Sequence, residues 1–162
     1  MSDAKRRSVE IAELSWQEAE RHLTPDAVVM MPLGAMAKEH GPHLKLDNDY
    51  RLAESIKSLV MDRTSVVAAP TIGYHYYPAF TSYPGSTHLK FVTARDLVVE
   101  IAKSLAAHGP RRFYVLNTGI STAGPLTAAA AILKTFGILM EYTDMLTVAA
   151  DVEETLAEQR RG

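Results

Sequence analysis

Side chains that can bind metals are concentrated in one short stretch of the chain, residues 31–50. Two histidines and three carboxylates fall within eleven residues, namely Glu39, His40, His43, Asp47 and Asp49. Divalent ions such as zinc and manganese bind mixtures of imidazole nitrogen and carboxylate oxygen. The stretch therefore predicts a divalent-metal site.

The residues on either side of this stretch predict the elements that hold it. Residues 27–33 form an apolar run that is typical of a buried strand, and Pro32 and Gly34 end it. Residues 50–61 carry apolar side chains at helical spacing, and Asp49 is also well placed to cap that helix. A loop that follows the carboxyl end of a strand is where open α/β sheets place their sites.

The rest of the chain alternates between helical and strand patterns. Ser15 and Glu18 form a capping-box pattern at the start of a short helix, and Thr93 is a candidate cap for a later one. The predicted helices cover residues 15–22, 50–61, 93–107, 126–136 and 148–160, and the predicted strands cover residues 27–33, 65–69, 112–116 and 138–142. This order predicts a single α/β domain over residues 1–162, with a mainly parallel sheet and helices on both faces.

Composition excludes several classes of function. A net charge of -2 without a basic block provides no electrostatic footprint for nucleic acid, so no such partner is expected. The absence of cysteine excludes disulfides and thiolate-bound metals. No apolar run approaches the roughly 20 residues that span a bilayer, and no signal region follows the charged start. We therefore expect a soluble cytoplasmic protein without a membrane partner.

The central stretch resembles the signature of the creatininase (creatinine amidohydrolase) family. It reads Pro32-Leu-Gly-Ala-Met-Ala-Lys-Glu-His-Gly-Pro-His-Leu44 and is followed by Asp49. Residues 13–18 are similar to the family's first helix, residues 83–89 to its Phe-Pro-Gly-Thr loop, and residues 115–119 to its strand before Asn-Gly-His. The resemblance implies a creatininase-like fold and hydrolysis of a small cyclic or linear amide C–N bond by metal-activated water. It also implies a homo-oligomer, often a hexamer, and one or two zinc or manganese ions.

Position by position, the resemblance implies that His40 and Asp49, nine residues apart, are metal ligands. Lys38 stands where the family has a glutamate. A backbone shifted by one residue would let Glu39 serve as the third ligand and as a catalytic group. Lys38 itself is either a solvated charge or a cation that neutralises the carboxylates.

Two departures from the family pattern leave a second function open. Residues 117–122 replace the family's Asn-Gly-His loop and contain no imidazole or carboxylate. A second metal ion would therefore find no ligands in this loop. Asn117 is expected to help shape the site as a catalytic residue. The chain also lacks the family's later segment that is rich in His and Glu. The alternative is therefore a non-catalytic or shortened member that acts as a binding or assembly subunit.

Other polar and aromatic loop residues allow more than one interpretation. We expect His43, Tyr83 and Ser121 to contact substrate, although His43 could instead orient its loop. Asp47 is expected to bond nearby backbone amides. The tyrosines of the long loop, residues 71–88, form either a pocket wall or a subunit contact. The amides of residues 118–122 could instead bind an anion, or this segment could be an ordinary helix cap.

Overall fold

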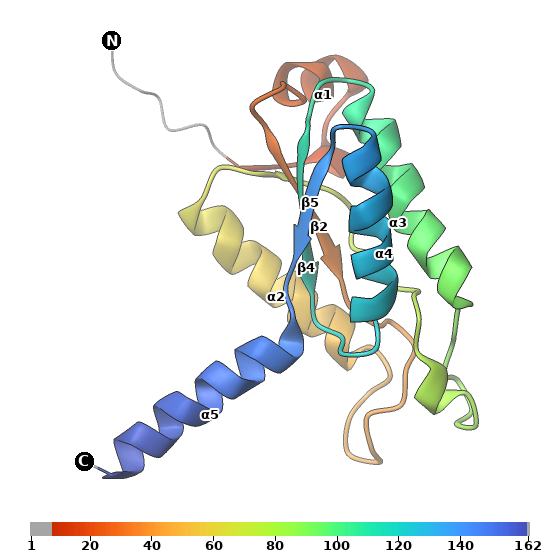
Figure 1. Ribbon diagram of the computed structural model, residues 1–162, viewed down its shortest axis with the longest axis vertical. Helices are drawn as coiled ribbons and strands as arrows, with labels where there is room; N and C mark the ends of the chain where they lie inside the picture. Colours follow the sequence, from red (N-terminus) through yellow and green to blue (C-terminus); the bar gives the residue numbers. More distant parts are fainter. Residues whose placement is uncertain (1–7, 162) are drawn as a thin grey trace.

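One five-stranded parallel sheet organises the chain, as seen in a computed structural model that describes residues 8–161 (Figure 1). The strands are β1 (Val9–Glu10), β2 (Val28–Leu33), β3 (Val67–Ala68), β4 (Arg112–Asn117) and β5 (Leu139–Tyr142). The helices are α1 (Trp16–His22), α2 (Asn48–Arg63), α3 (Phe91–Ala106), α4 (Ala123–Thr135) and α5 (Met145–Arg161), with 3-10 turns η1 (Ile11–Glu13) and η2 (Pro78–Phe80). The predicted α/β class with a parallel sheet is confirmed.

Strand β2 occupies the centre of the sheet, whose order is β1-β3-β2-β4-β5. It pairs with β3 on one side and along its whole length with β4 on the other, from Val28 opposite Arg112 to Leu33 opposite Asn117. The chain leaves β2 toward β3 and then crosses back to β4. The boundary between β2 and β4 is therefore the topological switch point, where α/β folds place their ligands.

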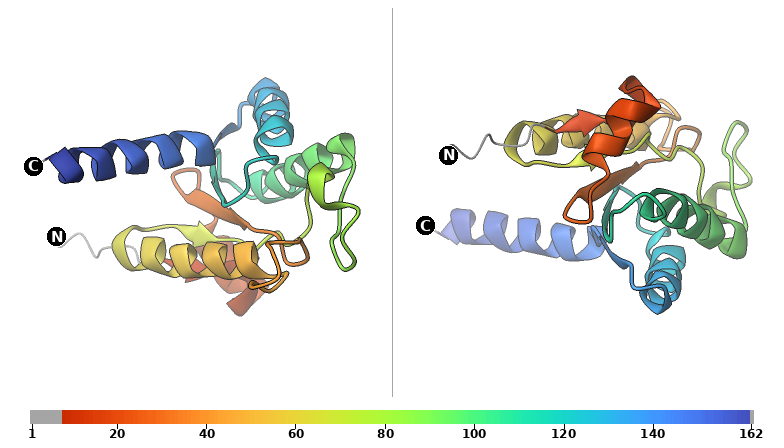
Figure 2. Two further views of the ribbon diagram at one scale, coloured as in Figure 1. Left: turned by 90° about the horizontal axis from the view of Figure 1, so that it is seen from below. Right: turned by 90° about the horizontal axis from the view of Figure 1, so that it is seen from above.

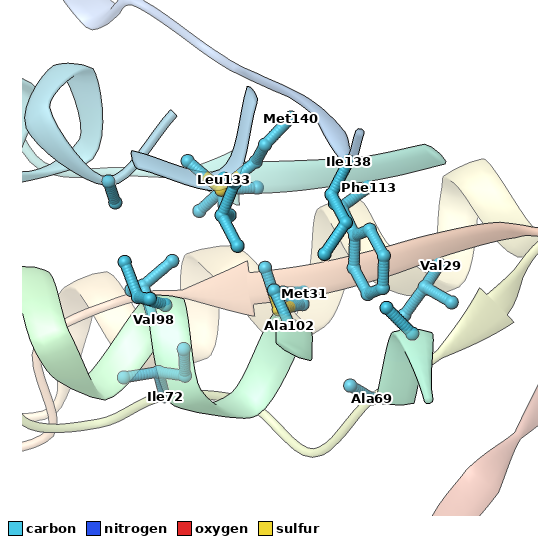
Figure 3. Packing of buried hydrophobic residues seen from close by; sticks show 14 of the residues in the cluster. Val29, Met31, Ala69, Ile72, Val98, Ala102, Phe113, Leu133, Ile138 and Met140 are labelled. Atoms are coloured by element: carbon cyan, nitrogen blue, oxygen red, sulfur yellow. The ribbon is translucent and has the colours of Figure 1, made fainter. Parts of the chain in front are cut away.

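Helices cover both faces of the sheet, as predicted (Figure 2). Helices α3 and α4 pack on one face, and α2 packs on the other. The alternation of side chains along β2 serves both layers, because Met31 and Leu33 join the core under α3 and α4 whereas Met30 joins the core under α2. Figure 3 shows the larger core, in which Val98 and Ala102 of α3 lie against Met31. Burying each large side chain of this kind contributes about 1.5–3 kcal/mol.

Local sequence signals set several element boundaries correctly and others incorrectly. Helix α1 starts with the predicted capping box, in which Glu18 N donates to Ser15 Oγ and Ser15 N donates to a Glu18 carboxylate oxygen at 2.8 Å. Thr93 is not a cap, because α3 begins two residues before it at Phe91. Asp49 is not a cap either, since α2 begins at Asn48 and Asp49 lies in its first turn. Strand β1 was not predicted, and α5 begins three residues before the predicted start.

The loops that follow β2 and β3 lie at the same end of the molecule, beyond the carboxyl ends of the strands (Figure 1). Helix α5 leads away from the rest of the domain in both figures. Among the described residues, no helix is both long and apolar enough to cross a membrane.

Candidate active site

Gly34, directly after β2, lets three segments meet at the switch point. A Cβ atom on Gly34 would lie 2.2 Å from the carbonyl oxygen of Asp49, so only glycine allows this approach between β2 and the first turn of α2. Thr118, after β4, donates its hydroxyl to the carbonyl oxygens of both Asp49 and Leu33 at 3.1 Å. The Tyr50 N–H donates to the Ala35 carbonyl. These contacts fix the backbone on both sides of the Asp49 side chain.

The Asp49 carboxylate is shared between a histidine and a lysine. His40 Nε2 lies 2.8 Å from Asp49 Oδ1, and Lys38 Nζ lies 2.5 Å from Asp49 Oδ2. The exposed fractions of the three side chains are 11% for His40, 11% for Asp49 and 13% for Lys38. The predicted ligands His40 and Asp49 are thus brought together. Lys38 was predicted to be either a solvated charge or a cation that neutralises the carboxylates, and the structure shows the second.

Two aromatic side chains of the long loop form a wall over this cluster. The Lys38 ammonium lies 5.6 Å from the ring centroid of Tyr77 and 5.2 Å from that of Phe80, within range of cation–π attraction. Tyr77 is only 1% exposed, and its hydroxyl has no hydrogen-bond partner among the described residues. Burial, and then the negative charge of Asp49, raise the pKa of the Tyr77 hydroxyl.

Hydrogen bonds from the long loop fix the segment that carries Lys38 and His40. Thr87 donates its N–H and its hydroxyl to the Ala37 carbonyl at 2.8 and 3.0 Å. The Glu39 N–H donates to Ser86 Oγ at 3.0 Å, and the Lys38 N–H donates to the Leu46 carbonyl at 3.1 Å. The direction of the Lys38 side chain is therefore set by an anchored backbone.

The Glu39 carboxylate does not join the cluster of His40 and Asp49. It accepts a hydrogen bond from the backbone N–H of Gly41, two residues later in its own loop. Among the residues whose side chains the structure describes, no three from His, Cys, Asp or Glu form a group that could hold a metal ion. The roles of Glu39 as third ligand and catalytic group stay predictions, and the structure shows its carboxylate engaged in a turn.

Asn117 uses both ends of its side chain to shape the loop after β4. Its Nδ2 donates to the carbonyl oxygens of Gly119 and Thr143 at 2.6 and 3.1 Å. Its Oδ1 accepts from the Gly119 N–H at 3.1 Å and from the Thr122 hydroxyl at 2.7 Å. The side-chain amide of Asn117 is buried and both of its ends are hydrogen-bonded, which fits a role in shaping the loop. A catalytic role for Asn117 stays a prediction.

The loop of residues 118–122 is partly bonded within the chain, and its anion-binding alternative stays a prediction. The N–H groups of Thr118 and Gly119 donate to Leu33 O and Asn117 Oδ1 respectively. Thr122 occupies the N-cap position of α4, but its side chain makes no cap bond. Ser121 donates its hydroxyl to the Tyr76 carbonyl at 2.8 Å, which joins this loop to the tyrosine-rich loop. Contact between Ser121 and substrate stays a prediction.

The remaining predicted residues lie outside the cluster. His43 is exposed, and Tyr83 is 49% exposed, so both stay candidate substrate contacts at the surface. Asp47 does not bond backbone amides as predicted, because its Oδ2 accepts from Arg51 Nε at 2.7 Å on the next helical turn. Asp47 directly precedes α2 and Arg51 lies four residues later in its first turns, so the charged guanidinium is within reach of the Asp47 carboxylate.

Sequence reasoning assigned no specific role to Tyr77, Phe80 and Thr118, which complete the site. A weak signal existed for Tyr77, since the tyrosines of the long loop were predicted to form either a pocket wall or a subunit contact. No local pattern identifies which tyrosine turns inward, because that depends on contacts between loops that lie about 40 residues apart in the chain.

The donor atoms of His40 and Asp49 fit a divalent metal, but two ligands are fewer than a metal site usually has. Both ring nitrogens of His40 are buried and have no hydrogen-bond partner among the described residues, since the 2.8 Å contact with Asp49 lacks the direction of a hydrogen bond. A free imidazole nitrogen beside a carboxylate oxygen is a donor pair for zinc or manganese. Catalytic zinc sites usually have three protein ligands, so the pair supplies two of them.

The fold and the site together define a class of protein: a parallel α/β domain with an imidazole–carboxylate pair at the carboxyl ends of its central strands. The chain belongs to the creatininase family, because the family model described as creatinine amidohydrolase matches residues 12–162. Creatinine amidohydrolase from Pseudomonas putida is 32% identical over 117 residues, which cover 68% of this chain and 45% of that protein. The match confirms the predicted family.

A second relative and solved structures extend the likeness. Mycofactocin precursor peptide peptidase from Mycolicibacterium smegmatis is 31% identical over 114 residues, 66% of this chain and 45% of that protein. Solved structures of creatininase in an Mn form and of a variant in a Zn–Zn form are each 27% identical, with TM-score 0.71, covering 85% of this chain and 58% of theirs. This chain thus spans less than half the length of the two curated relatives.

Proposed function

We propose that this chain acts in metal-dependent hydrolysis of a C–N bond in a small cyclic or linear amide. The observation that carries the proposal is the buried pair of His40 Nε2 and Asp49 Oδ1, 2.8 Å apart at the switch point of the sheet. His40 and Asp49 would hold the ion together with ligands from outside this cluster. A bound zinc or manganese ion supplies a polarising charge and an acidic water molecule.

The protein's own residues prepare the site for that chemistry. Thr118 and Gly34 fix the backbone of Asp49, so its carboxylate faces His40 without depending on a flexible loop. Tyr77 and Phe80 close one side with apolar rings, which excludes water and strengthens electrostatic interactions. The Tyr77 hydroxyl, which has no partner in the described part of the chain, is available to donate a hydrogen bond to a substrate oxygen.

Support for the substrate class comes from the names of the two relatives, one a creatinine amidohydrolase and the other a peptide peptidase. Creatinine is a cyclic amide and a peptide is a linear one, so the shared element is a C–N bond next to a carbonyl group. We therefore expect the substrate of this chain to contain that group.

Metal content and amidase activity test the proposal together. The purified chain would be incubated with zinc or manganese, desalted and measured by elemental mass spectrometry, beside His40→Ala. His108→Ala is the matched control, because His108 is exposed in the turn between α3 and the amino end of β4, away from the carboxyl ends of the strands. We expect retained metal and chelator-sensitive amide hydrolysis in the chain and in the control, and loss of both in His40→Ala. Absence of metal from every sample would contradict the proposal.

A specific observation favours a second function, a binding or assembly subunit without catalysis. Lys38 already neutralises Asp49, and the pair supplies only two of the three usual zinc ligands. On this alternative, chelator leaves both stability and ligand binding unchanged. A chain that binds metal yet hydrolyses no amide substrate would fit neither function as stated and would point to an incomplete ligand set.

A homo-oligomer, such as a hexamer, and a cytoplasmic location stay predictions. Exposed apolar side chains near the two loops support association, because such groups are enriched at subunit contacts. Tyr74 and Tyr83 of the long loop are 50% and 49% exposed, and Ile120 in the loop after β4 is 61% exposed. Light scattering on the eluate of a sizing column would measure the oligomeric state, and a monomer at micromolar concentration would contradict this expectation.

A further inference from the structure

The Lys38 side chain points into the candidate site instead of toward solvent. Its ammonium lies 2.5 Å from Asp49 Oδ2 and faces the rings of Tyr77 and Phe80. A lysine ammonium is normally one of the most strongly hydrated groups of a protein, so this placement must be compensated by the carboxylate and the rings.

The backbone around Lys38 makes this orientation a built feature. The residue before it is held by two hydrogen bonds from Thr87, and the residue after it by one to Ser86. The Lys38 N–H is itself bonded to the Leu46 carbonyl. With the main chain held on both sides, the side chain leaves the loop toward Asp49.

A positive charge at Asp49 Oδ2 is what a metal ion would otherwise provide. The carboxylate has His40 at one oxygen and Lys38 at the other, so its charge is neutralised without any ion. A divalent cation that approaches His40 and Asp49 meets an ammonium only a few ångströms away, and like charges at that distance repel each other strongly in a partly buried site.

We propose that Lys38 is an internal counter-cation that competes with divalent metal for Asp49, so that metal binds only when the ammonium withdraws. The inference rests on the proposed function, which assigns His40 and Asp49 to the metal. The side chain has a route outward, because 13% of its surface is exposed. The site then exists in two forms, one closed by Lys38 and one open to metal.

Zinc affinity measured by calorimetry tests this competition in the full chain. Lys38→Met removes the ammonium and keeps a long apolar side chain beside the rings. Lys45→Met is the matched control, because Lys45 is exposed in the same loop and its loss changes the net charge equally. We expect Lys38→Met to bind zinc about tenfold to a hundredfold more tightly than the wild-type chain, and Lys45→Met to change affinity less than about threefold.

The outcomes separate this inference from the proposed function. If the wild-type chain and Lys38→Met bind zinc equally and His40→Ala abolishes binding, the metal pair stands and the competition is wrong. If none of the variants binds zinc, the proposed function and this inference both fail. Lys38→Gln, checked by circular dichroism for folding, replaces Lys38→Met if the methionine variant does not fold.

A second measurement uses only the wild-type chain. Withdrawal of the ammonium should make Lys38 more reactive toward an amine-acetylating reagent when zinc chloride is added. Peptide mass spectrometry would compare acetylation of Lys38 with that of Lys45 in the same sample. We expect zinc to raise labelling of Lys38 at least about threefold and to leave Lys45 unchanged. Unchanged or lower labelling of Lys38 in the presence of bound zinc would overturn the inference.

Discussion

Two largely buried lysines, Lys38 and Lys57, are neutralised by carboxylates in very different ways. Lys57 of α2 lies between two partners, 3.1 Å from Glu10 of β1 and 2.8 Å from Glu54 on its own helix. Thr71 donates a further hydrogen bond to Glu54. Lys38 has one carboxylate, Asp49, which it shares with His40. The first cluster has more acceptors than its single cation needs, whereas the second has one acceptor for two basic groups.

This difference distinguishes a structural cluster from a candidate binding site. Burial lowers the pKa of Lys57, but the hydrogen bonds that its ammonium donates to Glu54 and Glu10 outweigh burial and raise the pKa, so the ammonium is stabilised in place. In the other cluster, both ring nitrogens of His40 and the hydroxyl of Tyr77 are buried without a hydrogen-bond partner among the described residues. Buried polar atoms nearly always have partners, so an arrangement that leaves three of them open is suited to a ligand.

The largest expected effect comes from Gly34→Ala, which should disrupt the candidate site and spare the Lys57 cluster. The new Cβ atom would overlap the Asp49 carbonyl oxygen, and backbone on both sides would have to move. We expect the free energy of unfolding, measured with urea, to fall by more than about 3 kcal/mol. Gly137→Ala is the control, because no heavy atom of the other described residues, apart from its two chain neighbours, lies within 4 Å of its Cβ position. Its positive φ of 69° alone should cost about 1 kcal/mol. Equal losses in the two variants would contradict the tight approach at Gly34.

Acid should destabilise the fold through His75 of the long loop before it affects the Lys57 cluster. His75 is fully buried and bonded to the Ala94 carbonyl, and burial lowers the pKa of its imidazole from 6.5 to about 4. The unfolded chain therefore binds this proton first as the pH falls. The contribution of His75 is constant above about pH 7, declines between pH 6.5 and 4, and is constant below that, for a total loss of about 3 kcal/mol. Hydrogen bonds from Lys57 and Thr71 outweigh burial and lower the pKa of Glu54, so that carboxylate stays ionised over the same range.

Unfolding by urea from pH 7.5 to 4.5 measures this dependence. His75→Gln keeps an N–H donor for the Ala94 carbonyl and should flatten the curve in that range. His108→Ala, at an exposed position, should leave the curve of the wild-type chain unchanged. If His75→Gln retains the full acid dependence, another group is responsible.

Substituting each lysine by methionine compares the two clusters directly. Lys57→Met leaves the carboxylates of Glu10 and Glu54 beside an apolar group without their cation. Because both carboxylates are 36% exposed, the free energy of unfolding should fall by only about 2 kcal/mol. Lys38→Met should cost about 1 kcal/mol, because Asp49 keeps its contact with His40. If the metal proposal holds, zinc would restore the melting temperature of Lys38→Met alone, by preferential binding to the folded state. A larger loss for Lys38 than for Lys57 would reverse the assignment of the two clusters.

Elements whose signals are local could be predicted from the sequence. The capping box of α1, the apolar run of β2 and the helical spacing in α2 each depend on neighbours within a few residues, and each was confirmed. Strand β1 is only two residues long and exists because Val9 and Glu10 pair with β3, almost 60 residues later. No local pattern in so short a segment distinguishes it from a loop.

The candidate site was predictable in its residues and not in its arrangement. The types and spacing of His40 and Asp49 identified the pair, because both lie in one loop next to a predicted strand end. The inward direction of Lys38 depends on Ser86 and Thr87, which fix its loop from the other side of the site. The hydrogen bond from the Gly41 N–H to the Glu39 carboxylate likewise depends on the conformation of the loop. The one-residue shift between Glu39 and the family's glutamate position does not predict that conformation.

The smallest expected effect on stability, from Tyr77→Phe, is also the most selective test of the open cluster. The hydroxyl of Tyr77 is buried and has no partner within the residues that the structure describes, so its removal should leave the free energy of unfolding unchanged or raise it by less than about 1 kcal/mol. The ring remains, and with it the contact with Lys38. If the hydroxyl is kept for a substrate oxygen, amide hydrolysis or substrate affinity should fall about tenfold in the same variant. Tyr114→Phe is the control, because its hydroxyl is bonded to Thr143 on the exposed side of β4. A loss of stability in Tyr77→Phe as large as about 2 kcal/mol, with unchanged substrate affinity, would show that the hydroxyl has a structural partner and that the cluster is closed like that of Lys57.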